Sequence, residues 1–147
     1  PIYCPEDAVL VADGDEISFG GSSIGVILTP GHTPGSCCYH IGGDLITGDT
    51  LFIYGCGRAD LSGSDPHALY HSLQKLKALP PETRLHVGHH YGIAETGTLG
   101  EQLAGNPFLL IDNEADFVRY RMELAGKTRH TPYGPISRAE LDAVLHG

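Results

Sequence analysis

The stretch that most constrains this chain is Thr29-Pro30-Gly31-His32-Thr33-Pro34-Gly35-Ser36. An apolar, β-branched run at 24–28 leads into it, and a second strand-like run at 37–41 follows it. Its two prolines fix the backbone angle φ, and its two glycines allow backbone angles that other residues resist. The stretch therefore predicts a tight loop that holds one imidazole, that of His32, at the end of a strand.

The residues after this loop predict a β-hairpin. Gly42-Gly43 separates the run 37–41 from the run 44–48 and suits a two-residue turn. If the two runs pair, the residues just outside the open end of the hairpin, His32 and Asp49, lie close together. A histidine and a carboxylate that converge at one sheet edge form a metal-binding or an acid–base arrangement.

A third candidate ligand follows a later strand. The short apolar run 84–87 ends in a glycine that is followed by His89, and a glycine also precedes Asp49 at the end of its strand. A lone histidine is more often an ordinary polar residue than a ligand. Three ligand-type side chains, each just beyond a short strand and beside a glycine, nevertheless favour a metal site built from His32, Asp49 and His89.

Four segments resemble consecutive motifs of the metallo-β-lactamase superfamily: TPGHTPGS at 29–36, LITGDTLF at 45–52, GCGR at 55–58 and GHHY at 88–91. The closest branches are glyoxalase II (hydroxyacylglutathione hydrolase) and its sister group, the persulfide dioxygenases. The similarity continues through NPFL at 106–109 and covers most of the chain, from about Asp13 to Arg121. It implies an α/β fold, the αβ/βα sandwich of that family.

One family motif is absent from the sequence. The first metal motif, His-x-His-x-Asp-His, does not occur, and the chain begins at Pro1 with a strand-like Ile2-Tyr3 that resembles the middle of a family member. We therefore expect residues 1–147 to form a single domain that corresponds to the C-terminal part of the sandwich, with its N-terminal portion missing. The alternative is a degenerate member that has lost half of its ligands.

The resemblance implies a role for each candidate ligand. His32 would complete the three histidines of a first metal, Asp49 would bridge two metals as the central catalytic residue, and His89 would bind the second. Imidazole and carboxylate suit Zn²⁺ and Fe²⁺. Two zinc ions and a metal-bound hydroxide would hydrolyse a thioester or similar acyl substrate. The alternatives are a persulfide dioxygenase with one iron, and an inactive fragment or interaction protein without metal.

Arg58 and Tyr91 are the predicted substrate-binding residues. By the resemblance, Arg58 stands where relatives carry a basic residue that contacts glutathione, and Tyr91 matches a tyrosine with a similar role. A guanidinium group can bind a carboxylate through two parallel hydrogen bonds, which suits a glutathione conjugate or another small thiol-derived substrate. The alternative is that Arg58 braces its own loop, against Asp60 or Asp65.

Composition excludes other classes of partner. The net charge of −9 argues against a nucleic-acid groove, and no apolar run approaches the ~20 residues that span a bilayer. The four cysteines show no C-x-x-C spacing, which predicts a reduced, cytoplasmic setting. Cys56, between two glycines, is interpreted as a small buried residue and not as a nucleophile. With 41% hydrophobic residues, the chain is expected to form a packed core.

The incomplete ligand set leads to one more expectation. Each metal would keep about one imidazole and a share of the Asp49 carboxylate, fewer than the three protein ligands of a hydrolytic zinc site. The missing strands would also leave apolar sheet surface uncovered. We expect the chain to be inactive by itself and to associate with a second copy or with a complementing N-terminal segment.

Turn and capping signals predict the remaining elements. Asp65-Pro66 is a helix start, Ser137-x-x-Glu140 is a capping box, and Asp112 is predicted to cap a helix whose polar face carries Arg119 and Arg121. Strands are expected at 8–12 and 16–19, and helices at 66–79, 98–104, 112–124 and 138–146.

Overall fold

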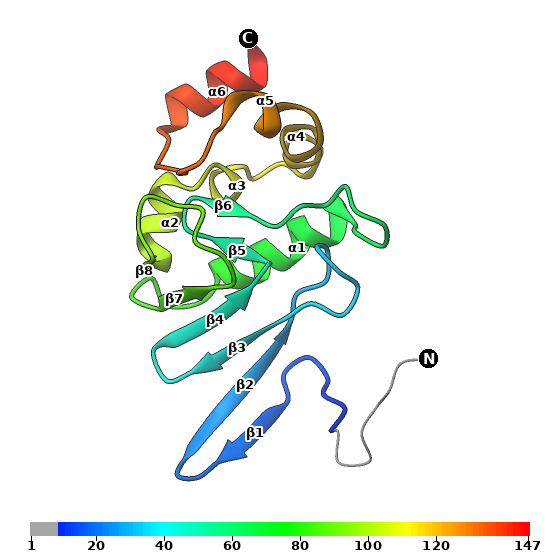
Figure 1. Ribbon diagram of the computed structural model, residues 1–147, viewed down its shortest axis with the longest axis vertical. Helices are drawn as coiled ribbons and strands as arrows, with labels where there is room; N and C mark the ends of the chain where they lie inside the picture. Colours follow the sequence, from blue (N-terminus) through cyan, green and yellow to red (C-terminus); the bar gives the residue numbers. More distant parts are fainter. Residues whose placement is uncertain (1–8) are drawn as a thin grey trace.

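The computed structural model describes residues 9–147, and most of its strands form one six-stranded sheet (Figure 1). The expectation of a strand at Ile2-Tyr3 lies outside these residues. The strand order is β1-β2-β3-β4-β7-β8, and every neighbouring pair is antiparallel except β4 and β7, which are parallel. The strands are β1 (Glu16–Phe19), β2 (Ser22–Leu28), β3 (Cys37–Ile41), β4 (Asp44–Gly48), β7 (Arg84–Val87) and β8 (Thr96–Thr98).

The predicted hairpin is present, and it places the candidate ligands. β3 pairs with β4 so that Tyr39 lies opposite Ile46, and Gly42 adopts a φ of 58° in the turn between them. The chain then crosses one face of the sheet as α1 (Pro66–Lys77) and returns as β7, parallel to β4. Parallel strands end at the same edge of a sheet, so the segments after β4 and β7 meet there.

Helix α1 closes the core on one face of the sheet. The side chain of Asp65 accepts hydrogen bonds from the backbone N–H groups of His67 and Ala68, and Pro66 occupies the first turn, as the sequence predicts. The apolar side of α1 is fully buried in one cluster with Leu45 of β4 and Leu85 of β7; its members from the helix are Leu69, Leu73 and Leu76.

The opposite face of the sheet is partly open. A hollow of about 240 Å³ is lined by apolar side chains from the first four strands: Ile17, Ile24, Tyr39, Ile41 and Ile46. Phe19 is 72% exposed and Ile46 is 43% exposed. In Figure 1, strands β1–β3 extend away from the helices. Among residues 9–147, this apolar sheet surface therefore has only partial cover.

The C-terminal helices pack beyond the short hairpin of β5 (Leu51–Phe52) and β6 (Gly55–Cys56) (Figure 1). The buried side chain of Asn106 joins the two parts, because its Nδ2 donates to the carbonyl groups of Phe52 and Gly55 and its Oδ1 accepts from the N–H of Phe108. The helices are α2 (Leu99–Gly105), α3 (Pro107–Leu110), α4 (Glu114–Arg119), α5 (Ala125–Thr128) and α6 (Arg138–His146).

Three predictions of secondary structure from the sequence are wrong in detail. Residues 9–12 form no strand. The cap of α4 is Asn113 and not Asp112, and the predicted single helix continues through a π-helical turn, Tyr120–Leu124, into α5. The capping boxes at Thr98 and Ser137 are present. None of the helices of residues 9–147 has the length and apolar character that crossing a membrane requires.

Candidate metal centre

The loop 29–36 is tied to the elements on both sides of it. The Thr29 N–H donates to the Ser36 carbonyl oxygen at 2.8 Å, which closes the loop at its base. The hydroxyl of Ser72, on α1, donates to the carbonyl of Pro30 at 2.7 Å, and the hydroxyl groups of Thr29 and Thr50 lie 2.8 Å apart. These buried contacts fix the loop against α1 and against the end of β4.

His32 is held in one orientation by its Nδ1 atom, which lies 2.9 Å from the carbonyl oxygen of Arg58. A carbonyl oxygen can only accept a hydrogen bond, so Nδ1 carries the proton and donates. In the neutral ring, Nε2 then presents its lone pair, which is the arrangement found when a second contact orients a metal-binding histidine. The backbone of the Gly-Cys-Gly-Arg motif therefore orients the imidazole.

Asp49 lies between two imidazole rings. Its Oδ2 is 3.3 Å from Nε2 of His32, and its Oδ1 is 3.3 Å from Nε2 of His89. Each ring thus faces a different oxygen of the same carboxylate. The side chains of His32, Asp49 and His89 are 17%, 31% and 53% exposed, so the group is open to solvent. The structure brings together all three side chains that the sequence singles out.

The spacing fits metal ligands. Two ligand atoms at ~2.0–2.1 Å from one tetrahedral zinc ion lie about 3.3 Å apart. The Nε2 lone pair of His32 faces an oxygen of the Asp49 carboxylate, so a cation can lie between these two atoms. In the described part of the chain, however, no three His, Cys, Asp or Glu side chains form a complete set around one ion. The trio therefore fits as a carboxylate bridge with one imidazole on each side, and its role as ligands stays a prediction.

Two glycines make this arrangement possible by close approach. A Cβ atom at Gly88 would lie 2.6 Å from Oδ1 of Asp49. A Cβ atom at Gly57 would lie 2.0 Å from the carbonyl oxygen of Asp49 and 3.1 Å from Cβ of His32. Real Cβ contacts are essentially never this short, so any larger residue at either position displaces Asp49 or its neighbours.

Arg58 and Tyr91 take up different surroundings. The Arg58 guanidinium forms two hydrogen bonds with Asp60, from Nε to Oδ1 and from Nη2 to Oδ2, both 2.9 Å long. This pair raises the pKa of Arg58 and lowers that of Asp60. Tyr91 stacks on His89 with ring centroids 5.3 Å apart, and its ring also meets Phe52 edge-on. The predicted brace between Arg58 and Asp60 is therefore present, while Tyr91 lies directly beside a candidate ligand.

One cavity of about 170 Å³ joins both predicted substrate residues, and its lining is Phe52, Cys56, Arg58, Tyr91, Arg121, Thr131 and Tyr133. Helical periodicity predicts Arg121 on a polar helix face, and no sequence pattern predicts a role for Tyr133. Arg121 lies in the π-helical turn, and its side chain lines this cavity together with Cys56 of β6. Burial raises the pKa of Cys56 to about 12, so this thiol stays neutral, in line with its interpretation as a packing residue.

Comparison with known proteins gives a consistent result. Residues 2–89 match the family model of the metallo-beta-lactamase superfamily. The hydroxyacylglutathione hydrolase of Rhizobium johnstonii is 48% identical, over 87% of this chain and 62% of that protein. The probable polyketide biosynthesis zinc-dependent hydrolase BaeB of Bacillus velezensis is 38% identical, over 77% of this chain and 51% of that protein.

A solved structure extends the likeness to nearly the whole chain. The crystal structure of ETHE1 from Myxococcus xanthus superimposes with a TM-score of 0.75 and 30% identity, over 99% of this chain and 61% of that one. The chain thus spans between half and two thirds of the length of these three proteins. The matched segment contains the loop of His32, the end of β4 and the end of β7. On the fold, the motifs and the family model together, the chain belongs to the metallo-β-lactamase superfamily.

Proposed function

We propose that this chain carries part of the two-metal centre of a hydrolase that cleaves a thioester or a similar acyl substrate. The observation that supports this most directly is the Asp49 carboxylate, whose two oxygens each face a different imidazole at 3.3 Å. His32 and Asp49 would hold one ion, and Asp49 and His89 the other. Bound zinc would supply water with a pKa lowered toward ~7, a nucleophile at neutral pH.

The residues around the ligands have supporting roles in this proposal. The Arg58 carbonyl keeps the His32 ring in the orientation that presents Nε2 to the metal. Phe52 and Tyr91 pack against the ring of His89 and restrict its movement.

The cavity beside Tyr91 favours an anionic substrate, and we propose a glutathione thioester. Two guanidinium groups, those of Arg58 and Arg121, and the ring of Tyr133 line this cavity of about 170 Å³. Glutathione carries two carboxylates that such groups can bind. The pair of Arg58 with Asp60 is exposed to solvent, where ion pairs are weak. A substrate carboxylate can therefore compete for Arg58.

The proposal requires further ligands from outside the trio. Each ion would have one imidazole and one carboxylate oxygen, whereas a hydrolytic zinc site uses about three protein ligands. We propose that a further polypeptide segment or a second copy of the chain supplies the remaining imidazoles. The partly open sheet face lined by Ile24, Tyr39 and Ile46 is suited to pack against such a segment.

A second candidate is a persulfide dioxygenase, which would use a single iron. The likeness over 99% of the chain to ETHE1, which is a persulfide dioxygenase, favours this candidate. In that case His32 and Asp49 would hold the ion together with one further histidine, and His89 would be dispensable for metal binding. The two candidates therefore differ in metal stoichiometry and in the role of His89.

Metal analysis combined with a hydrolysis assay tests the proposal. The chain would be purified after growth with added Zn²⁺ or Fe²⁺, and metal content and hydrolysis of S-D-lactoylglutathione would be measured. For the chain alone we expect substoichiometric metal and negligible hydrolysis. A complementing segment that carries histidines should restore both metal binding and hydrolysis. Restoration of one iron and persulfide oxidation would instead favour the dioxygenase. Robust hydrolysis by the monomer with two tightly bound zinc ions would contradict the incomplete ligand set.

A further inference from the structure

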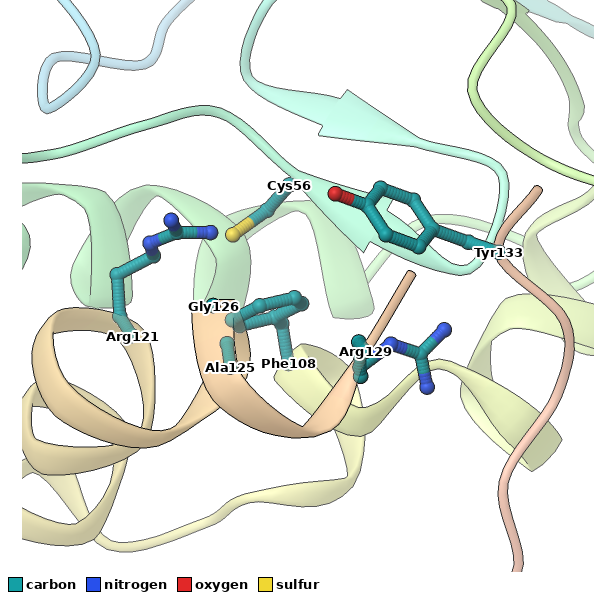
Figure 2. Close-up of a pocket in the computed structure, with 7 residues that line it drawn as sticks. All are labelled: Cys56, Phe108, Arg121, Ala125, Gly126, Arg129 and Tyr133. Carbon is teal, nitrogen blue, oxygen red and sulfur yellow. The ribbon is translucent and has the colours of Figure 1, made fainter. Parts of the chain in front are cut away.

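A small cavity lies next to the wider one, between β6 and the C-terminal helices. Its volume is about 40 Å³, and its lining is Cys56, Phe108, Arg121, Ala125, Gly126, Arg129 and Tyr133. Figure 2 shows the side chain of Arg121 extending toward the sulfur of Cys56, with Phe108 between Arg121 and Arg129. The two cavities share Cys56, Arg121 and Tyr133, so the small one continues the wider one inward.

Two charged hydrogen-bond donors that line this cavity have no acceptor. The Nε atoms of Arg121 and Arg129 are buried without a partner in the part of the chain that the structure describes. A buried donor without an acceptor is destabilising, and more so when it is charged. Such a concentration of unpaired donors at one place indicates an absent acceptor.

The acceptor is not supplied by the protein's own carboxylates. No ion pair within residues 9–147 includes Arg121 or Arg129, although the chain has a net charge of −9. The charge of Arg121 is a minor contribution to the lowered pKa of Asp60, which is already bound by Arg58 through two hydrogen bonds. The cavity is therefore a positively charged place in an acidic protein.

The two guanidinium groups are held in place before any ligand arrives. Nη2 of Arg129 donates to the carbonyl groups of Tyr54 and Gly134, at 2.9 and 2.8 Å, and its guanidinium carbon lies 5.3 Å from the ring centre of Tyr133. The guanidinium carbon of Arg121 lies 5.5 Å from the ring centre of Phe108. Fixed groups lose little freedom on binding, which favours affinity.

We propose that this cavity binds a small oxyanion, held by the buried Nε donors of Arg121 and Arg129. The volume of about 40 Å³ exceeds the ~10–15 Å³ that one water needs and suits a carboxylate group or an inorganic oxyanion. The neutral thiol of Cys56 lies beside Arg121 but is only a weak hydrogen-bond acceptor, so an oxyanion binds the arginine in preference to it. The oxyanion is either a free ion or, on the basis of the function proposed above, the carboxylate end of a substrate that enters through the wider cavity.

Thermal unfolding in different anions tests this inference without the metal centre. The melting temperature would be measured in EDTA at constant pH and ionic strength, with chloride replaced stepwise by phosphate, sulfate or acetate. A second series would compare S-methylglutathione with its dimethyl ester, which lacks both carboxylates. Each series would use the original chain, Arg121→Gln, Arg121→Lys and the control Arg119→Gln. Arg119 lies two residues away and donates to the Leu145 carbonyl, outside the cavity.

We expect a saturable rise in melting temperature with at least one oxyanion, and an apparent dissociation constant at least tenfold higher in Arg121→Gln. Arg121→Lys should be intermediate, because it keeps the charge and loses the Nε donor, while Arg119→Gln should respond as the original chain does. A response to inorganic anions identifies a free ion, whereas a response to S-methylglutathione and not to its ester identifies a substrate carboxylate. The inference is overturned if no oxyanion stabilises the chain, or if Arg121→Gln responds as Arg119→Gln does. If Arg121→Gln does not fold, the comparison of Arg121→Lys with Arg119→Gln decides in the same way.

Discussion

The substitution Gly57→Ala tests the packing that holds the candidate metal centre. The new Cβ atom would lie 2.0 Å from the Asp49 carbonyl oxygen, whereas real Cβ contacts essentially never fall below 3.0 Å. The two backbone segments must therefore separate by at least 3.0 − 2.0 = 1.0 Å. Because the obstacle is backbone and not a flexible side chain, the strain cannot be relieved by a rotamer change. We expect destabilisation at the upper end of the ~1–3 kcal/mol typical of overpacking.

The same displacement should disturb the candidate metal ligands, because Asp49 is one of them and the Cβ atom of His32, another, lies 3.1 Å from the new Cβ atom. Functional geometry tolerates shifts of only about 0.5 Å, so metal affinity should fall by roughly 10–100-fold. The melting temperature should fall by roughly 5–12 °C for a chain of this size. Calorimetry and a competitive zinc titration would measure both effects. Gly43→Ala is the matched control, because a Cβ atom there meets nothing within 4 Å. A Gly57→Ala variant that matches this control in both measurements would refute the reasoning.

Three further predictions concern the centre and its surroundings. Asp49→Ala should lower the metal content of the folded protein more than His89→Ala does, since Asp49 faces both imidazoles; equal losses in elemental analysis would contradict the bridging role. In the chain combined with the complementing segment, Arg58→Ala should raise KM for glutathione thioesters by roughly one to two decades with metal content unchanged, whereas unchanged KM with lowered stability would indicate a loop brace only. Lys77 chiefly holds the pKa of Asp112 below 3.8, so Asp112→Asn should lower stability in urea at neutral pH, and this difference should vanish as the pH falls through that lowered pKa.

The convergence of the candidate ligands could be predicted from the sequence because it depends on strand rules alone. A two-residue turn at Gly42-Gly43 sets the hairpin, and the hairpin fixes where His32 and Asp49 emerge. The run before His89 is short and apolar, and a helix precedes it, which is the pattern of a parallel neighbour. Local capping signals were equally reliable at Asp65 and Ser137, because they involve only adjacent backbone groups.

The remaining features depend on contacts that a sequence does not reveal. Val9 and Leu10 look like a strand, yet they are 81% and 87% exposed, because no neighbouring strand pairs with them. Asp112 and Asn113 are both good caps; Asn113 takes the role while Asp112 binds Lys77 and Arg138. Helical periodicity assigns Arg121 to a polar face, but the residue lies in a π-helical turn, which has a different periodicity, and its side chain lines a cavity.

Because β4 and β7 pair in parallel, the geometry of the site does not depend on the number of residues that link Asp49 to His89. Asp49 and His89 meet because two strands lie side by side, and the helix between them only returns the chain to the correct edge. Its connection to β7 is exposed at Ala78, Pro81 and Glu82. Residues inserted there would extend a surface loop without moving either ligand. The number of residues between Asp49 and His89 is thus free to drift during evolution, while the distance between their side chains is not.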